Sequence, residues 1–376
     1  MADTQALIGN IELAPRAAPG VAASLPAILS LATGVPGAGY TQAEIFDYLQ
    51  HLFQRTRHAR FIFNRAGVDR RYMAADREFY LQPQGTEARN NAYMARALPL
   101  GAETIARCLA GAGLTPADVD DFFVVSCTGL DIPGLDLRLA GQLGMRADLR
   151  RTCVLGMGCY AAFPALHRAR EAVAARPGRL ALVLALELCS LHLQDDDSLE
   201  NMVVSALFAD GAAAALIGSA DVMTPAADGT PRGPRLVDAA TYCDYTTFDH
   251  MAFHVTDHGF QMRLSAYVPD VLAANVEAFI DPLLARNGLT RADVAFWGVH
   301  PGGSKILDYL QERLALDEAQ MRYSRAVLRD YGNMSSPTIL FVLDQIQRQG
   351  QPAPGDYGLL MAFGPGLTME AAVIQW

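Results

Sequence analysis

Cys159 is the residue in this chain whose surroundings best suit covalent chemistry. It follows Gly156 and Gly158 at the end of an apolar stretch from Thr152 to Leu155, which we predict to be a buried strand. The alanine-rich segment after the cysteine indicates a helix. Such a turn would place the sulfur at the N-terminus of a helix, where the helix dipole favours a thiolate. A buried, unreactive core thiol fits the same local sequence.

Two further loops carry polar residues that could serve a nucleophile. His300 follows the apolar run Phe296 to Val299, and Asn333 precedes an apolar helical segment from Thr338 to Ile346. Taken singly, a structural histidine and a capping or turn asparagine are the better interpretations. Together with Cys159, each lies beside glycine at a predicted strand end or helix start. The three residues therefore form a candidate nucleophilic set.

The composition argues against several classes of function. The chain has 376 residues, of which 51% are hydrophobic, and a formal net charge of -10. An acidic chain without a basic cluster is a poor match for a nucleic-acid surface. Its six cysteines form no C-x-x-C pair and have no histidine at ligand spacing, so we expect no metal site. We find no secretory leader and no apolar stretch of membrane-spanning length, and we expect a cytoplasmic protein.

Two stretches of the chain resemble each other. Gly113 to Val119 and Gly288 to Val294 share the pattern Gly-Leu-Thr-x-Ala-Asp-Val, and each lies between a helix-like segment and a short apolar run. Asp210-Gly211 and Pro365-Gly366 likewise each precede a further apolar strand. A repeated order of this kind indicates duplication.

Apolar strands that alternate with helical segments indicate a sheet buried on both faces in an α/β protein. We therefore predict two duplicated α/β halves, residues 1–225 and 226–376, with a Pro- and Gly-rich boundary near 218–235. The first 40 or so residues are predicted to be an irregular lead-in.

Five ordered motifs resemble those of the bacterial type III polyketide synthases, the chalcone-synthase-like branch of the thiolase-fold condensing enzymes. The resemblance covers nearly the whole chain and implies a thiolase-like fold with layered αβαβα architecture and a homodimer. The motifs are Gly156-Met157-Gly158-Cys159, Ala206-Leu207-Phe208-Ala209-Asp210-Gly211, His300-Pro301-Gly302-Gly303, Gly332-Asn333-Met334-Ser335-Ser336 and Phe363-Gly364-Pro365-Gly366.

The resemblance implies a catalytic role for the three residues already singled out. Cys159 would accept the acyl group, and His300 would be its imidazolium partner. His300 and Asn333 would donate hydrogen bonds to the thioester oxygen of malonyl-CoA, so that decarboxylation leaves a stabilised enolate. This enolate would attack the acyl group on Cys159. No metal or redox cofactor is required.

The resemblance also implies where coenzyme A enters. Phe208 and Phe253 match the gatekeepers between the CoA tunnel and the cavity. Lys305, the only lysine of the chain, and Arg55 match positions for cations that bind CoA phosphates. A solvated surface charge is the alternative for either cation.

Several residues match positions that line the family's substrate cavity. Ile132, followed by Pro133, matches a loop that crosses into the partner subunit's cavity, and this peptide bond would be cis by analogy. Cys127 and Cys189 are typical of bacterial members that make naphthalene, resorcinol or pyrone products, although small core hydrophobes are the alternative. The cavity-lining set is Cys127, Thr128, Ile132, Cys189, Leu191, His192, Ser335 and Pro365.

Two other functions stay open at this point. One is a ketoacyl-ACP synthase III of fatty-acid initiation, which shares the Cys-His-Asn set. The other is a non-catalytic assembly partner with a thiolase fold. Within the polyketide synthase hypothesis, our first prediction is a medium- or long-chain acyl starter that yields an alkylpyrone or alkylresorcinol. Our second is a malonyl-only route to a polyhydroxylated aromatic.

Overall fold

The computed structural model describes residues 25–37, 39–219, 233–265 and 267–376, and its two halves have the same strand order. In the first half the order is β1-β7-β6-β4-β5, and in the second it is β8-β13-β12-β11. The first-half strands are β1 (Pro26–Gly34), β4 (Asp121–Val125), β5 (Arg150–Val154), β6 (Ala181–Leu188) and β7 (Asp210–Ser219). The second-half strands are β8 (Arg235–Cys243), β11 (Val294–Val299), β12 (Tyr357–Gly364) and β13 (Thr368–Gln375).

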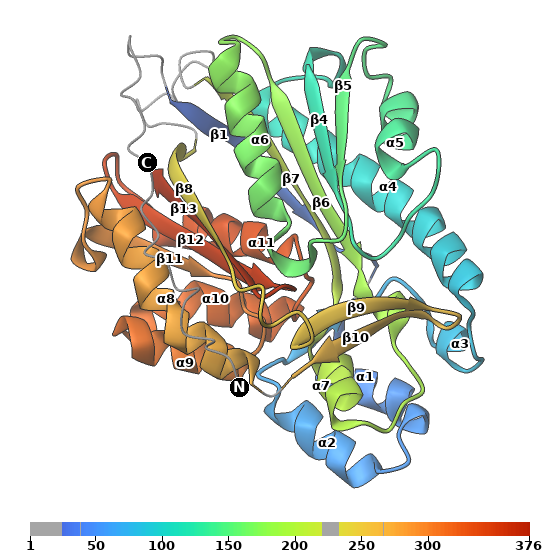
Figure 1. Ribbon diagram of the computed structural model, residues 1–376. Coiled ribbons are helices and arrows are strands. Elements are labelled where there is room, and N and C mark those ends of the chain that lie inside the picture. The colour runs from blue at the N-terminus through green and yellow to red at the C-terminus, as the bar shows by residue number, and fades with distance from the viewer. Residues whose placement is uncertain (1–24, 38, 220–232, 266) are drawn as a thin grey trace, which may run out of the picture.

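Strand directions agree between the halves as well. β4 runs parallel to β6 and β6 antiparallel to β7, just as β11 runs parallel to β12 and β12 antiparallel to β13. β1 pairs with β8 through Ala27 and Arg235, which joins the halves into one nine-stranded sheet. Figure 1 shows the second half, in orange and red, beside the first half, in blue to green. The predicted duplication is confirmed.

The repeated Gly-Leu-Thr-x-Ala-Asp-Val segments fold alike down to their side chains. Each ends a long helix, α4 (Thr86–Ala112) or α8 (Val268–Ala285). In the first copy the backbone N–H of Thr115 donates to Asp118 at 2.7 Å, and in the second Thr290 donates to Asp293 at 2.7 Å. These reciprocal caps stabilise the turn that leads into β4 or β11.

Helices cover both faces of the sheet, and two of them lie between its two halves, which gives five layers. On β6, Leu182, Leu184 and Leu186 belong to one core, whereas Ala181, Val183 and Ala185 belong to the other. α4 packs on β1, β6 and β7, and α8 packs on β8 and β13. Between the halves lie α6 (Ala162–Ala175) and α11 (Thr338–Gln345), which contact strands of both. The alternating helix and strand layers give the thiolase-like architecture.

The remaining elements surround this core. α5 packs on β4 and β5, α10 packs on β11, and a separate hairpin of β9 and β10 lies over α7 (Figure 1). Their bounds are β2 Gly39–Thr41, α1 Gln42–Leu49, α2 Thr56–Arg65, β3 Arg70–Tyr72, α3 Arg77–Tyr80, α5 Leu135–Leu143, α7 Leu199–Leu207, β9 Met251–Thr256, β10 Gly259–Leu264, α9 Ser304–Leu314 and α10 Glu318–Tyr331.

Two sequence expectations about the fold are wrong. The predicted irregular lead-in contains β1, a central strand whose ladder with β7 the composition of residues 1–40 did not reveal. The predicted buried strand before Cys159 is β5, the edge strand, whose residues 150–153 are exposed because no neighbour covers its outer side in the single chain. The predicted domain boundary between residues 225 and 226 lies outside the described residues.

Candidate active site

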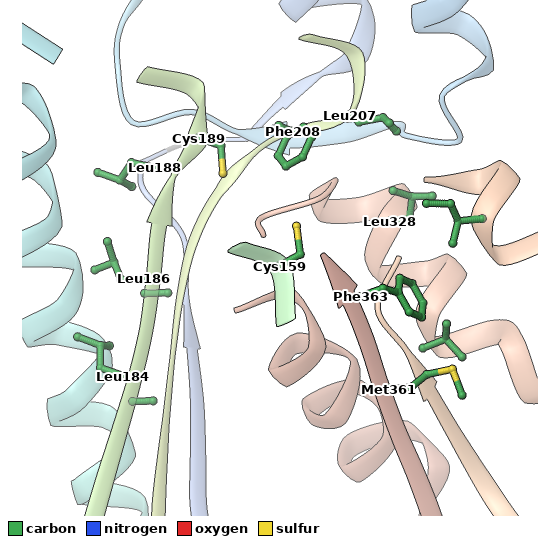
Figure 2. Close-up of a cluster of buried hydrophobic side chains, with 14 of the residues drawn as sticks. Cys159, Leu184, Leu186, Leu188, Cys189, Leu207, Phe208, Leu328, Met361 and Phe363 are labelled. Atoms are coloured by element: carbon green, nitrogen blue, oxygen red, sulfur yellow. The ribbon is translucent and has the colours of Figure 1, made fainter. Parts of the chain in front are cut away.

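Cys159 lies in a short turn between β5 and α6, as predicted. Gly156 and Gly158 have φ angles of 72° and 74°, in the left-handed region that glycine adopts without strain. A Cβ atom on Gly158 would also lie 2.7 Å from the Pro365 ring. The Cys159 side chain is 4% exposed. Figure 2 shows its sulfur pointing toward Phe208 and Cys189.

The second half contributes His300 and Asn333 from two loops. His300 directly follows β11 and is 1% exposed, and Asn333 lies between α10 and α11 and is 2% exposed. The Asn333 backbone pairs with the first half, donating to Leu207 at 2.9 Å and accepting from Ala209 at 2.9 Å. Its side-chain oxygen accepts the Ser335 N–H at 2.8 Å, which leaves the amide nitrogen as the available donor.

A chain of contacts brings the three loops together. The Asn333 amide nitrogen is 3.4 Å from the Gly302 carbonyl, two residues beyond His300. The His300 ring packs edge-on against Phe363, with 6.2 Å between ring centroids. A Cβ atom on Gly364 would lie 3.3 Å from the Cys159 nitrogen. The predicted nucleophilic set therefore converges on one buried region where the two halves meet.

Burial dominates the electrostatics of this region. It raises the pKa of the Cys159 thiol to about 11, although hydrogen bonds from the Ser335 and Asn333 side chains lower it. Burial lowers the pKa of His300 to about 3. Within the described part of the chain, neither ring nitrogen of His300 has a hydrogen-bond partner. Burial thus opposes the charged forms of both groups, and the thiolate–imidazolium pair that the family resemblance implies stays a prediction.

Glu187 is a buried acid at this site that we did not predict. It accepts hydrogen bonds from Thr128 Oγ1 at 2.7 Å, Cys127 N at 2.9 Å and Ser336 Oγ at 2.7 Å. It therefore ties the loop after β4 to the loop after Asn333, across the two halves. Burial raises the pKa of the Glu187 carboxyl to about 7. A lone acid within the apolar run 181–188 was the available sequence signal.

This carboxyl makes the stability of the fold depend on pH. Its folded-state pKa lies above the ordinary value of 4.5, so the folded state binds more protons between these two pH values. The free energy of unfolding should therefore fall as pH rises from about 4.5 to 7, by an amount on the order of 3 kcal/mol from this group. Denaturant melts of wild type and Glu187→Gln from pH 5 to 8 measure the difference. Parallel pH profiles of the two proteins would contradict this prediction.

An outer pocket of about 600 Å³ lies on the side of α2, α7 and α9. Lys305 and Arg65 line it, together with apolar residues such as Phe61 and Leu264. Arg55 does not line it; its guanidinium instead forms an ion pair with Asp197 at 2.7 Å. Of the two cations predicted to bind CoA, only Lys305 therefore faces this pocket. Arg65 is a second cation there that we did not predict.

A second cavity of about 610 Å³, called the inner cavity, lies beside the Cys159 turn. It is open to solvent in the single chain, since lining residues such as Tyr245 and Val255 are exposed. Cys127, Gly158 and Pro365 line it, and so does Phe253. None of its described lining residues has a charged side chain. The Cys127 sulfur accepts the Gly158 N–H at 3.1 Å, and burial raises the pKa of Cys127 to about 12. Cys127 therefore supports the nucleophile turn as a neutral thiol.

A small space of about 20 Å³, called the constriction, is lined by both predicted gatekeepers and shares Phe253 with the inner cavity. Phe208, which is 3% exposed, ends α7, and Phe253 lies on β9. Met262, directly across the hairpin from Phe253, is a third apolar side chain here that we did not predict. Cys189 and His192 complete the wall. Several predicted cavity residues thus line the gate.

The other predicted cavity residues lie outside the constriction and the inner cavity. Thr128 and Leu191 are buried and line none of the three spaces above, since Thr128 binds Glu187 and Leu191 lies in the core. Ser335 hydrogen-bonds the Cys159 thiol. Ile132 precedes a cis peptide bond to Pro133, as expected, and is 90% exposed in the single chain.

Comparison with known proteins identifies the family. Residues 17–221 match the model of the N-terminal domain of chalcone and stilbene synthases, and residues 237–376 match that of the C-terminal domain. The chain belongs to the chalcone and stilbene synthase family. It is a type III polyketide synthase, an acyltransferase-type condensing enzyme with a thiolase-like fold.

Relatives of this synthase include bacterial proteins with different products. The chain is 34% identical over 351 residues to a 3,5-dihydroxyphenylacetyl-CoA synthase of Amycolatopsis balhimycina, covering 92% of this chain and 91% of the relative. It is 30% identical over 361 residues to an alpha-pyrone synthesis polyketide synthase-like protein of Mycobacterium tuberculosis. This match covers 93% of this chain and 90% of the relative.

A solved structure supports the same assignment. The 1,3,6,8-tetrahydroxynaphthalene synthase of Streptomyces coelicolor A3(2), a bacterial type III polyketide synthase, matches with a TM-score of 0.85 and 30% identity. The match covers 93% of this chain and 99% of that one. In the described residues of this synthase, no helix combines the length and apolar character needed to cross a membrane.

Proposed function

We propose that this synthase condenses malonyl-CoA with an acyl group held on Cys159, using His300 and Asn333 as hydrogen-bond donors. One observation carries the proposal: Cys159, His300 and Asn333 converge where two loops of one half meet a turn of the other. A cation-lined outer pocket, a narrow gate and an uncharged inner cavity accompany this site. This arrangement suits a substrate with a charged carrier and an apolar acyl chain.

Loading of the acyl group needs a base for the Cys159 thiol. Burial favours the neutral form of His300, and neither of its ring nitrogens has a partner among the described residues. It can therefore accept the thiol proton as the sulfur attacks the thioester carbon of the starter. The S–C bond to the enzyme forms, the bond to CoA breaks, and the proton leaves with the CoA thiol.

Condensation uses the same polar groups in a second role. The amide N–H of Asn333 and an N–H of His300 would donate to the thioester oxygen of malonyl-CoA. Loss of carbon dioxide leaves an enolate whose charge these donors stabilise. The enolate carbon attacks the acyl carbon on Cys159, and the C–C bond forms as the C–S bond breaks. The extended chain is then on CoA and can reload.

Assay of the purified protein with acyl-CoA starters and malonyl-CoA, without acyl carrier protein, tests this function. We expect carbon dioxide release and polyketide products by mass spectrometry. Turnover only with malonyl-ACP would instead support a ketoacyl-ACP synthase III. Absence of both turnover and covalent acylation would support a non-catalytic assembly partner.

The absence of charge in the inner cavity favours an apolar acyl starter, with an alkylpyrone or alkylresorcinol as product. A malonyl-only route to a polyhydroxylated aromatic is the second candidate. The names of the dihydroxyphenylacetyl-CoA and tetrahydroxynaphthalene synthases favour this route. Products from malonyl-CoA alone, compared with those from octanoyl- and palmitoyl-CoA, distinguish the two.

Lys305 is proposed to bind a phosphate of CoA at the outer pocket. Lys305→Ala should raise the KM for malonyl-CoA roughly tenfold with little change in kcat, since a lost charge-assisted hydrogen bond costs about 1.5 kcal/mol. Arg55→Ala is the matched variant, because Arg55 is already paired with Asp197, and should change KM less than twofold. A larger effect of Arg55→Ala than of Lys305→Ala would contradict this assignment.

We also propose that the synthase is a homodimer built on the β5 edge. Among the described strands β5 pairs only with β4, so its outer edge is open to a second copy. Nearby Leu130, Ile132 and Leu155 are 54%, 90% and 48% exposed.

Sedimentation should give twice the chain mass of 40.5 kDa. Ile132→Glu should weaken the dimer, and Ile132→Val should not. A wild-type protein that is monomeric at about 10 µM would refute the proposed dimer.

We place the enzyme in the cytoplasm. All six cysteines are free thiols, as expected in a reducing compartment.

A further inference from the structure

One face of the β9–β10 hairpin contributes side chains to the outer pocket, to the constriction and to the inner cavity. Because side chains alternate along a strand, Phe260, Met262 and Leu264 lie on the same face of β10. Leu264 lines the outer pocket, Met262 lines the constriction, and Phe260 lines both the constriction and the inner cavity. Phe253 faces the constriction from β9, directly across from Met262. The position of this hairpin therefore sets the width of the path.

The hairpin needs contacts outside itself to hold that position. It is a two-stranded ribbon outside the nine-stranded sheet, and such ribbons are marginally stable alone. Its turn is tied to the start of α4, where Thr86 N donates to Asp257 O at 3.0 Å. Gly259 N in turn donates to Thr86 Oγ1 at 2.8 Å. Gln194 Nε2 also donates to the His258 carbonyl oxygen at 3.1 Å. These bonds fix the tip, whereas Phe253 and Met262 lie further along the strands.

His192 supplies a further contact, at Phe260. Its Nε2 lies 2.7 Å from the Thr128 carbonyl oxygen, and its Nδ1 accepts the Phe260 N–H at 3.1 Å. Its ring stacks on the Phe260 ring with 4.4 Å between centroids and 5° between planes. A carbonyl only accepts and a backbone N–H only donates, so the two partners require the neutral tautomer with Nε2 protonated. Burial lowers the pKa of His192 to about 4, which keeps the ring neutral.

The other end of this contact reaches the nucleophile turn. Thr128 follows Cys127, whose sulfur accepts the Gly158 N–H beside Cys159. Glu187 binds both Thr128 and Cys127, so this loop is held firmly. His192 thus joins the hairpin to a well-held loop next to the nucleophile.

We propose that His192 is a positioning residue that latches the β9–β10 hairpin to the Thr128 loop, and so sets the gate and the chain length that the inner cavity accepts. The claim rests on the proposed function, since it assigns the constriction to the passage of acyl and malonyl groups. The hydrogen bonds, more than the bulk of the ring, carry the effect. Without them the hairpin would open more often, and intermediates would escape or cyclise early.

Three variants separate hydrogen bonding from shape. His192→Phe keeps a ring to stack on Phe260 but loses both hydrogen bonds. His192→Gln keeps a donor that can reach the Thr128 carbonyl and should behave between Phe and wild type. His254→Phe is the matched control, because His254 is exposed on the other face of β9. Amide hydrogen exchange resolved at Phe260 and product mass spectrometry are measured for each.

We expect His192→Phe to increase the exchange rate of the Phe260 amide at least tenfold and to raise the fraction of short, prematurely released products at least threefold. His254→Phe should match wild type in both. Unchanged Phe260 exchange in His192→Phe would refute the latch, even if products change. Faster exchange with unchanged products would refute its role in chain length. A wild type that makes no polyketide would instead overturn the proposed function, while the exchange measurement would still report on the latch.

Discussion

Cys159→Ala should abolish formation of the acyl-enzyme and of every elongated product, a loss of at least roughly 10³-fold. The sulfur lies at the convergence of the three loops and can carry an acyl chain between condensations. Decarboxylation of malonyl-CoA to acetyl-CoA should persist in this variant, because His300 and Asn333 remain. Intact-protein mass spectrometry after incubation with acyl-CoA detects the covalent adduct directly.

The matched control removes another cysteine. Cys108 is buried on α4 beside Ser30, away from this site, so Cys108→Ala should keep wild-type turnover and acylation at a single site. Thermal unfolding should show that Cys159→Ala is folded, since loss of one buried sulfur costs only about 1–2 kcal/mol. Continued product formation by Cys159→Ala would transfer the nucleophilic role to another cavity thiol, such as Cys127 or Cys189, and would refute the proposed mechanism.

Asn333→Asp should slow decarboxylation of malonyl-CoA by about 10²–10³-fold, the typical effect of losing one preorganised donor to a developing oxyanion. The carboxylate would also face the enolate with a like charge. The substitution keeps a side-chain oxygen that can accept the Ser335 N–H, which in wild type is 2.8 Å away. The loop should therefore keep its shape, and release of carbon dioxide is the measurement.

Asn333→Ala provides the comparison. It loses the same donor and also the acceptor for Ser335, so it should be as inactive as Asn333→Asp and less stable. Asn275→Ala removes an asparagine that bonds Tyr242 and Val271 away from this site, and should keep full activity. If Asn333→Asp decarboxylates malonyl-CoA at the wild-type rate, Asn333 is not a donor to the enolate.

The sequence by itself determined the elements that carry this chemistry. Glycines around Cys159, the apolar run before His300 and the apolar segment after Asn333 predict a turn and two loops, because these patterns reflect local backbone preferences. The repeated Gly-Leu-Thr-x-Ala-Asp-Val segments predicted two similar halves. In the structure the two copies even share the Thr–Asp cap at 2.7 Å. Family resemblance then identified the synthase.

Only the tertiary structure decided the surroundings of these residues. Glu187 and Met262 belong to the site because of contacts made across layers and across a hairpin, which no local pattern records. Arg55 matches a CoA-binding position but is paired with Asp197, a residue 142 positions away. β5 is an edge strand because of its place in the sheet order, not its apolar residues.

Cys159 shows the same division most clearly. Its position on a turn between a strand and a helix follows from local sequence, and that much was predicted correctly. The charge of its thiol depends on how far water is excluded, and burial raises its pKa to about 11 instead of lowering it. Desolvation results from the packing of both halves around the sulfur. Local sequence therefore predicts where the nucleophile is, whereas the assembled fold sets the desolvation that shifts its pKa.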